Sequence, residues 1–421
     1  MKKSFLLFAF IISLHVTKAD NTPTPFVTSI KHEFVCDSII PAMVVRTLDD
    51  SIHAWIKNYT VSEPCNLPSE IVRCHDSVYC ERLRALPFEM ELSYNSHIRL
   101  FIERYAVHGR TQTANLLGLA NYYFPIFEYY LNKYGLPLEL KYLPVIESGL
   151  KPTIKSHAGA AGLWQFMVST GRMYGLEINS LIDERCDPAK STEAACRFMR
   201  DLFNIYKDWN LVIAAYNCGP GNVNKAIRRA GGKRDYWEIY PHLPHETRNY
   251  VPVFIGAAYT MNYHKKHNIC PRELDLSILT DTISTNKRIH LQQIAATLNM
   301  PMSEVRMLNP QYRKDIIPGL NKTYNICLPL DKIGEFIDKE TEILAYKTDE
   351  LITTQFEKIN AAQKNMDDIW GTGDVIYYKV KSGDTLGHIA MRYNVGVSKL
   401  KLWNKISGTN IRIGQRIKIY K

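Results

Sequence analysis

The spacing of apolar residues changes along the chain and predicts two kinds of structure. From Ser93 to about His267, apolar residues recur three to four positions apart, and short turns with glycine or proline separate the segments. This pattern is typical of amphipathic helices. It predicts one mainly α-helical domain at residues 90–268, after an N-terminal extension at residues 20–89 that prolines interrupt. Beyond Cys270, short alternating stretches typical of strands mix with short helical ones.

The first residues follow the pattern of an export signal. Lys2 and Lys3 precede an apolar run at residues 5–14, and small residues follow at residues 17–19. We therefore expect a signal peptide at residues 1–19, with an uncleaved anchor as the alternative. Because no later stretch is long and apolar enough to cross a membrane, we expect no transmembrane segment in the mature chain and a location in the periplasm or cell envelope.

The C-terminal region contains an internal repeat. Residues 291–295 align without a gap with residues 386–390, and the same offset pairs Asn309 with Asn404. Matches that persist at one offset predict two copies of a single small module.

We place these copies at residues 283–330 and 376–421. Residues 331–375 between them are rich in Lys, Glu and Asp, which predicts either an exposed helical spacer or a flexible linker. The first copy has Arg288, Ile289 and His290 where the second has its opening Gly-Asp-Thr turn.

Composition and charge narrow the function. A chain of 421 residues that is 46% hydrophobic and 22% charged is globular and long enough for several domains. Its net charge of +10 is concentrated at the C-terminus, because residues 377–421 contain ten Lys or Arg and one acid. Such a patch suits nucleic acid, an acidic membrane or an anionic cell wall. Export favours the wall, so we expect no nucleic-acid partner.

The nine cysteines are compatible with disulfides in an exported protein. The odd number leaves one thiol unpaired if all pairing is intramolecular. Several cysteines are close in sequence, so core packing or local disulfides are expected: Cys65, Cys74 and Cys80, and Cys186 and Cys196. None has zinc-ligand spacing with histidine. We therefore expect no metal and no cofactor.

Glu147 is the candidate for acid–base chemistry. Apolar residues at 140, 143 and 146 lie on one side of a predicted helix, which Gly149 ends. Glu147 therefore lies in the last turn, where the helix dipole and apolar neighbours both raise the pKa of a carboxyl group. A raised pKa suits a general acid near neutral pH. The alternative is a solvated surface glutamate.

Three later segments add polar and aromatic groups. Residues 156–167 pack small residues into a turn, which allows close approach of a ligand, and they supply neutral groups that bind sugar hydroxyls and acetamides. Residues 214–221 end a helix at a rigid turn, and residues 243–251 add a second acid and a second tyrosine.

Together with Glu147-Ser148-Gly149, these segments occur in an order that resembles the four signature blocks of the soluble-lytic-transglycosylase domain, glycoside hydrolase family 23. The run at residues 136–144 is similar to the membrane-bound lytic murein transglycosylase D branch, and the resemblance covers about residues 90–268. It implies a lysozyme-like α-helical fold with a glycan groove, and Glu147 as catalytic acid/base. The groove residues that it implies are Ser156, Gln165, Met167, Tyr216, Asn217, Glu246 and Tyr250.

Some positions within these blocks carry other interpretations. Trp164, Phe166 and Tyr250 are also explained by ordinary core packing. Cys218 stands where the family more often has a small, alanine-like residue.

The mechanism that the resemblance implies uses a single carboxylate. Most glycosidases use two, but no second acid near Glu147 in sequence suits that task. Glu147 would protonate the glycosidic oxygen and then take the proton of the muramic acid 6-hydroxyl, which closes a 1,6-anhydro ring. Two other functions stay open, a hydrolase resembling goose-type lysozyme and a non-catalytic wall-binding protein.

The second repeat resembles a LysM domain, a βααβ module that binds glycans containing N-acetylglucosamine. The resemblance implies that Gly383, Asp384, Thr385 and Asn404 bind glycan. The first repeat resembles a LysM-derived module, either still glycan-binding or a spacer packed on the catalytic domain. The predicted fold class is thus mainly α, with a lysozyme-like catalytic domain followed by small α+β modules, and the expected partner is peptidoglycan.

Overall fold

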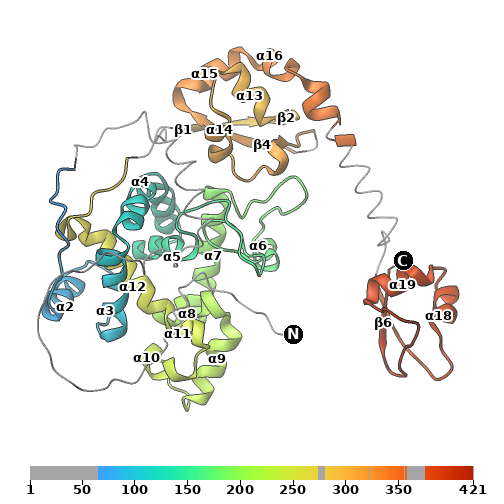
Figure 1. Cartoon of the computed structure of the whole chain (residues 1–421), viewed down its shortest axis with the longest axis horizontal. Helices are drawn as coiled ribbons and strands as arrows, with labels where there is room; N and C mark the ends of the chain where they lie inside the picture. The colour runs from blue at the N-terminus through green and yellow to red at the C-terminus, as the bar shows by residue number, and fades with distance from the viewer. Residues whose placement is uncertain (1–64, 274–279, 321, 355, 358–374, 421) are drawn as a thin grey trace, which may run out of the picture. The chain divides into compact units, whose positions relative to one another are not determined.

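The computed structural model describes residues 65–273, 280–320, 322–354, 356–357 and 375–420 (Figure 1). The predicted signal peptide and most of the predicted N-terminal extension lie outside the described residues. The chain divides into two compact units, with the boundary between Ile343 and Leu344.

The N-terminal part of the first unit is helical, as the apolar spacing predicts. Its elements are α2 (Asp76–Arg84), α3 (Ser96–Glu103), η1 (Arg104–His108), α4 (Arg110–Lys133), η2 (Leu138–Tyr142), α5 (Leu143–Ser148), α6 (Val168–Met173), α7 (Pro188–Tyr206), α8 (Trp209–Cys218), α9 (Pro220–Arg229), α10 (Tyr236–Ile239), η3 (Tyr240–His242), α11 (His245–Arg248), α12 (Tyr250–Tyr263) and η4 (His264–His267). Together with the strand-containing modules described below, this confirms the predicted mainly α fold class.

Helix α12 forms the centre of this domain, because its sequence is apolar on every side and it is buried from Tyr250 to Met261. It packs against α3, α5 and α8. The contact with α3 requires a glycine: a Cβ atom at Gly256 would lie 2.7 Å from the Cβ atom of Phe101. The central helix therefore fixes the spacing of the elements that carry the candidate site.

A disulfide joins Cys65 to Cys270, 205 residues apart, with 5.6 Å between their Cα atoms. The expected local pairing is therefore wrong for Cys65. The reason is that the chain before α2 returns to the end of the domain, where Asn268 Nδ2 donates a hydrogen bond to the carbonyl of Glu70. Cys74, Cys80, Cys186 and Cys196 are free thiols.

The first repeat is a small α+β module, called here the LysM-like module (residues 280–343). Two antiparallel strand pairs organise it, β1 with β4 and β2 with β3. Its elements are β1 (Thr280–Thr285), β2 (Ile289–His290), α13 (Leu291–Thr297), α14 (Met302–Leu308), η5 (Arg313–Asp315), β3 (Ile316–Ile317), β4 (Tyr324–Pro329) and α15 (Leu330–Asp338).

The stretch that follows is helical where the structure describes it. Helix α15 packs on β1 and β4 and buries Phe336, so this part of the predicted spacer completes the LysM-like module. Helix α16 (Glu340–Ala345) and η6 (Asp349–Thr353) continue the helical path. The described residues up to 354 are thus mainly helical, but α15 is packed on the module and is not the exposed spacer that the sequence suggested. Residues 358–374 lie outside the described residues.

The second repeat has the predicted βααβ order. It consists of β5 (Val375–Lys379), α18 (Leu386–Arg392), α19 (Val397–Asn404) and β6 (Arg416–Tyr420). Strands β5 and β6 pair antiparallel, with Val375 opposite Tyr420 and Lys379 opposite Arg416. Both helices bury apolar residues against the inner face of this sheet, which gives the module its own core.

One asparagine has the same structural role in both repeats. Asn309 Nδ2 donates to the carbonyls of Val305 and Cys327, and its Oδ1 accepts from the Cys327 amide. Asn404 does the same with Leu400 and Lys418. In each module the side chain satisfies both backbone groups of a strand residue and joins that strand to a helix. The shared hydrogen bonds confirm the predicted repeat.

Within the described ranges, no helix combines the length and apolar character that a membrane crossing requires.

Candidate active site

Glu147 lies in the last turn of α5, as predicted. The helix ends at Gly149, whose positive φ of 59° gives the left-handed cap that glycine favours. The first residue of α12, the buried Tyr250, donates a hydrogen bond from its hydroxyl to Glu147 Oε1. The catalytic candidate is thus held between a short helix and the central helix of the domain.

Burial is the main influence on the titration of Glu147. It raises the pKa of the carboxyl group from 4.5 to about 7, while the hydrogen bond from Tyr250 acts in the opposite direction. The direction is that expected from the sequence, and the main cause is loss of water around the carboxylate. Near neutral pH such a group exists in both protonation states, which suits a residue that first donates and then accepts a proton.

A second tyrosine lies near the carboxyl group. Tyr216, in α8, donates from its hydroxyl to the carbonyl of Trp164 at 2.7 Å. Burial raises the pKa of Tyr216 well above its usual value, and the charge of Glu147 raises it further. Burial and the charge of Glu147 also raise the pKa of Tyr250 well above its usual value. Both phenols therefore stay protonated and act as hydrogen-bond donors.

Asn217 has a structural partner that the sequence did not reveal. Its buried Oδ1 accepts from Thr247 Oγ1 at 3.0 Å, which ties the end of α8 to α11. Glu246, next to Thr247, is exposed and makes no hydrogen bond or ion pair with the described residues. Cys218 is buried, and burial raises the pKa of its thiol to about 11, so it is a poor nucleophile.

Residues 154–167 form a folded loop, called here the substrate loop, which contains three predicted groove residues. Ser156 Oγ accepts from the Ala160 amide at 3.1 Å, and Gln165 Nε2 donates to the carbonyl of Gly162 at 2.8 Å. Both polar side chains therefore stabilise the loop's own backbone. Met167 is partly buried at the N-terminus of α6.

Trp164 and Phe166 are core residues. Trp164 is fully buried, and its Nε1 donates to Thr192 Oγ1 at 2.8 Å. Phe166 is also buried, at an exposed fraction of 3%. The core-packing interpretation is therefore confirmed for both residues.

In the second LysM repeat, three predicted glycan-binding residues build the opening turn. Asp384 Oδ2 accepts from the Tyr378 hydroxyl at 2.6 Å and from the Lys381 amide at 2.8 Å. Thr385 caps α18 by accepting from the His388 amide at 3.1 Å, and Gly383 has a φ of 86°. The polar groups of this turn therefore bond within the module.

A shallow groove lies beside the fourth predicted residue, Asn404. It is lined by Tyr377, Trp403, Asn404, Lys405, Arg416 and Lys418. The guanidinium of Arg416 lies 4.9 Å from the centre of the Tyr377 ring. Asp384, the sole acidic residue between 375 and 420, is bonded elsewhere, so cations and aromatic rings dominate the groove.

Sequence reasoning missed Tyr377, Arg416 and Lys418. The signal was present, because alternate residues of paired strands share one face, and these three lie on the outer face of β5 and β6. Among the described residues, no cluster of three or more His, Cys, Asp or Glu could hold a metal ion.

The raised pKa of Glu147 predicts a pH-dependent cost in stability. Between about pH 4.5 and about pH 7 the folded carboxyl group keeps a proton that the unfolded one has lost, so stability is full below this window and falls as the pH rises through it. Glu147→Gln escapes this loss. Relative to wild type, it should gain on the order of 2 kcal/mol in free energy of unfolding between pH 4.5 and pH 8.

Urea unfolding at the two pH values measures this gain. Glu246→Gln is the matched control, because it removes the same charge from an exposed position. An equal gain in both variants would contradict burial as the cause.

Three regions of the chain match known domain families. Residues 124–239 match the Transglycosylase SLT domain, residues 279–345 the LysM-like domain of lytic transglycosylase MltD, and residues 378–419 the LysM domain. The chain is 30% identical over 293 residues to membrane-bound lytic murein transglycosylase D of Escherichia coli (strain K12), covering 69% of this chain and 61% of that protein. It thus spans about three fifths of the curated relative.

Two other matches concern soluble enzymes. The soluble lytic murein transglycosylase of Escherichia coli (strain K12) is 29% identical over 111 residues, which are 25% of this chain and 17% of that protein. The crystal structure of the 70 kDa soluble lytic transglycosylase from Escherichia coli aligns at 24% identity and a TM-score of 0.30, over 35% of this chain and 25% of that one. The chain thus carries a region that matches the Transglycosylase SLT domain, followed by regions that match the LysM-like domain of lytic transglycosylase MltD and the LysM domain.

Proposed function

We propose that the chain is a peptidoglycan lytic transglycosylase that cleaves the β-1,4 bond between MurNAc and GlcNAc. The observation that carries the proposal is the half-buried carboxyl group of Glu147, which has a pKa of about 7 and accepts a hydrogen bond from Tyr250. The SLT domain match and the similarity to lytic murein transglycosylases support the substrate class. A location at the cell wall in the periplasm follows from the same proposal.

The proposed mechanism uses Glu147 twice. Its carboxyl group first gives a proton to the glycosidic oxygen, and the bond between that oxygen and C1 breaks. Its carboxylate then takes the proton of the MurNAc 6-hydroxyl while O6 bonds to C1. The product is a 1,6-anhydro-MurNAc end, and no water is consumed.

The surroundings of Glu147 favour one carboxylate over two. Glycosidases with paired acids keep them about 5 to 9.5 Å apart, a separation at which charges interact strongly. Among the described residues, no other carboxylate influences the pKa of Glu147. Tyr250 instead supplies a neutral donor, which stabilises the carboxylate after it has released its proton. Glu246, exposed on α11, has no contact that supports its predicted role.

Glu147→Gln should abolish cleavage of purified glycan strands, because an amide has no proton to transfer at neutral pH. Mass spectrometry of the wild-type digest should find anhydromuramic ends. Reducing ends would instead support a hydrolase, and the absence of cleavage by wild type would support a wall-binding protein. More than a few per cent of wild-type activity in the folded variant would exclude Glu147 as the acid/base.

Tyr250→Phe should change the pH profile as well as the rate. The hydrogen bond from Tyr250 lowers the pKa of Glu147, so its removal raises that pKa and extends the protonated form to higher pH. The alkaline limb of kcat/KM should therefore move upward, while kcat falls about a hundredfold because a preorganised donor is lost. A slower enzyme with an unmoved alkaline limb would show that Tyr250 acts on packing alone.

We also propose that the second LysM repeat retains the enzyme on the wall. Deletion of residues 376–421 should abolish sedimentation with sacculi and leave cleavage of short soluble glycans intact, because this repeat has its own core. Within the full chain, Arg416→Ala should weaken sedimentation more than Lys379→Ala. Both changes remove one charge from the same sheet, but only Arg416 lines the groove. If both substitutions weaken sedimentation equally, the groove has no specific role and the repeat is held on the wall by general charge attraction.

A further inference from the structure

The LysM-like module is joined to one segment of the helical domain, called here the bridge segment (residues 176–187). A β-bridge pairs Ile182 with Tyr312 of the module. The Asp183 amide donates to the carbonyl of Gln311 at 2.9 Å. Backbone hydrogen bonds of this kind fix the register of the module on the bridge segment.

Side chains of the module add charged contacts to the same segment. Arg313 donates to the carboxylate of Asp183 and, through Nη1, to the carbonyl of Asn179 at 2.8 Å. Lys322 Nζ lies 2.7 Å from Glu177 Oε2. The Asp183 side chain is only 2% exposed, so the contact with Arg313 is shielded from water on one side.

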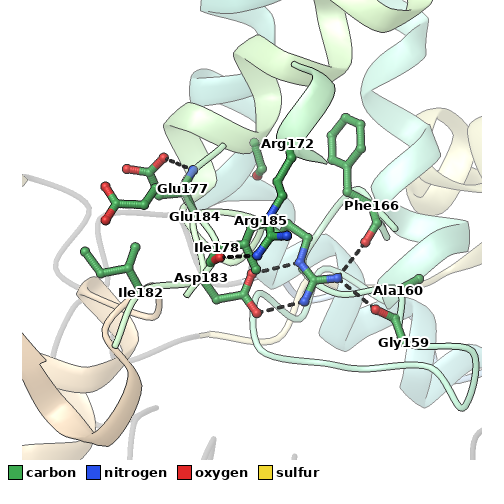
Figure 2. A network of polar contacts seen from close by, with 12 residues as sticks. Gly159, Ala160, Phe166, Arg172, Glu177, Ile178, Ile182, Asp183, Glu184 and Arg185 are labelled. Carbon is green, nitrogen blue, oxygen red and sulfur yellow. Dashed lines mark hydrogen bonds and ion pairs between the residues drawn. The ribbon is translucent and has the colours of Figure 1, made fainter. Parts of the chain in front are cut away.

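Asp183 also binds the guanidinium group of Arg185, which belongs to the same helical domain. Arg185 Nε and Nη2 each donate to Asp183 at 2.8 Å, and both side chains are almost fully buried (Figure 2). Burial by itself would raise the pKa of Asp183, but the hydrogen bonds from Arg185 and Arg313 outweigh it and lower that pKa below its usual value. Asp183 is therefore a stable anion between two guanidinium groups.

The third nitrogen of Arg185 points into the substrate loop. Nη1 donates to the carbonyl of Gly159 at 2.8 Å and to that of Phe166 at 3.0 Å, as Figure 2 shows. The backbones also meet closely here, because a Cβ atom at Gly162 would lie 1.7 Å from the Arg185 carbonyl oxygen. One buried guanidinium group thus joins two parts of the loop, at Gly159 and Phe166.

The substrate loop in turn contacts the candidate active site. The carbonyl of Trp164 accepts a hydrogen bond from the hydroxyl of Tyr216. The charge of Glu147 in turn contributes to the raised pKa of Tyr216. A continuous set of contacts therefore runs from Arg313 of the module, through Asp183 and Arg185, to the loop beside the catalytic candidate.

We propose that the LysM-like module is a brace for the substrate loop: Arg313 orients Asp183 and Arg185, which hold the loop in the shape that the Glu147 site requires. The three are positioning residues and touch no reacting atom. The inference rests on the function proposed above for Glu147. It assigns the module a role in turnover and not in wall retention.

The strength of the brace comes from burial and shared donors. Exposed ion pairs contribute little, but Asp183 and Arg185 are almost fully buried and Arg313 is only partly exposed, so the carboxylate and its two guanidinium groups form a coupled set in which each bond orients the next. Removal of Arg313 leaves Asp183 and Arg185 as a neutral pair, so the fold should persist while the orientation of Arg185 loosens.

The test uses the full chain with Arg313→Ala. We expect faster amide hydrogen exchange in residues 154–167, where the Ala161 amide bonds to the carbonyl of Phe166. We expect kcat on glycan strands to fall about tenfold or more with little change in KM, because a displaced loop misaligns bound substrate. Arg313→Lys, which keeps the charge, should restore part of both effects.

Arg306→Ala is the matched control. Arg306 forms a two-bond pair with Asp315 in the same module, at 2.9 and 2.7 Å, but this pair is more exposed and lies within the module. It should leave loop exchange and kcat as in wild type. A folded Arg313→Ala protein with unchanged loop exchange and unchanged kcat would overturn the brace.

Two further outcomes separate the brace from glycan binding by the module and from a failure of the proposed function. If Arg313→Ala weakens sedimentation with sacculi while loop exchange stays unchanged, the module binds glycan and the brace is wrong. If wild type cleaves no glycan strand, the proposed function fails, but exchange in residues 154–167 still tests the brace, because it is measured without substrate.

Discussion

The withdrawal of one carboxyl group from water is the constraint on which the candidate site depends. Where the surrounding core excludes water, the charged form of a carboxyl group is disfavoured and its proton is kept to higher pH. Helix α12, buried on all sides, provides that core and places Tyr250 against Glu147. The hydrogen bond from Tyr250 partly offsets the effect of burial, so the pKa of Glu147 is about 7. The same buried helix therefore forms the centre of the domain and supplies the hydrogen-bond donor to Glu147.

A second buried charge organises the loop beside this site. Asp183 binds Arg185 of its own domain and Arg313 of the LysM-like module, and Arg185 continues to the carbonyls of Gly159 and Phe166. In such a network each hydrogen bond orients the next group, so the loss of one member changes the orientation of the others. It gives the first repeat a physical connection to the helical domain.

The two repeats show how one small fold supports two surfaces. Both use an asparagine to join a strand to a helix, Asn309 in the first and Asn404 in the second. The first adds α15 to its sheet and directs Arg313 at the bridge segment. The second keeps the outer face of its sheet in water, with Tyr377 and Arg416 exposed there.

The sequence by itself determined the helical domain, the repeat and the position of Glu147 at a helix end, because these follow from local spacing and from glycine at the helix end. Only the tertiary structure decided the partners: Tyr250 for Glu147, Thr247 for Asn217, Cys270 for Cys65 and Arg313 for Asp183. These partners are 30 to 205 residues apart. No local pattern encodes such contacts, because they arise when packed elements bring distant side chains into a shared region from which water is excluded.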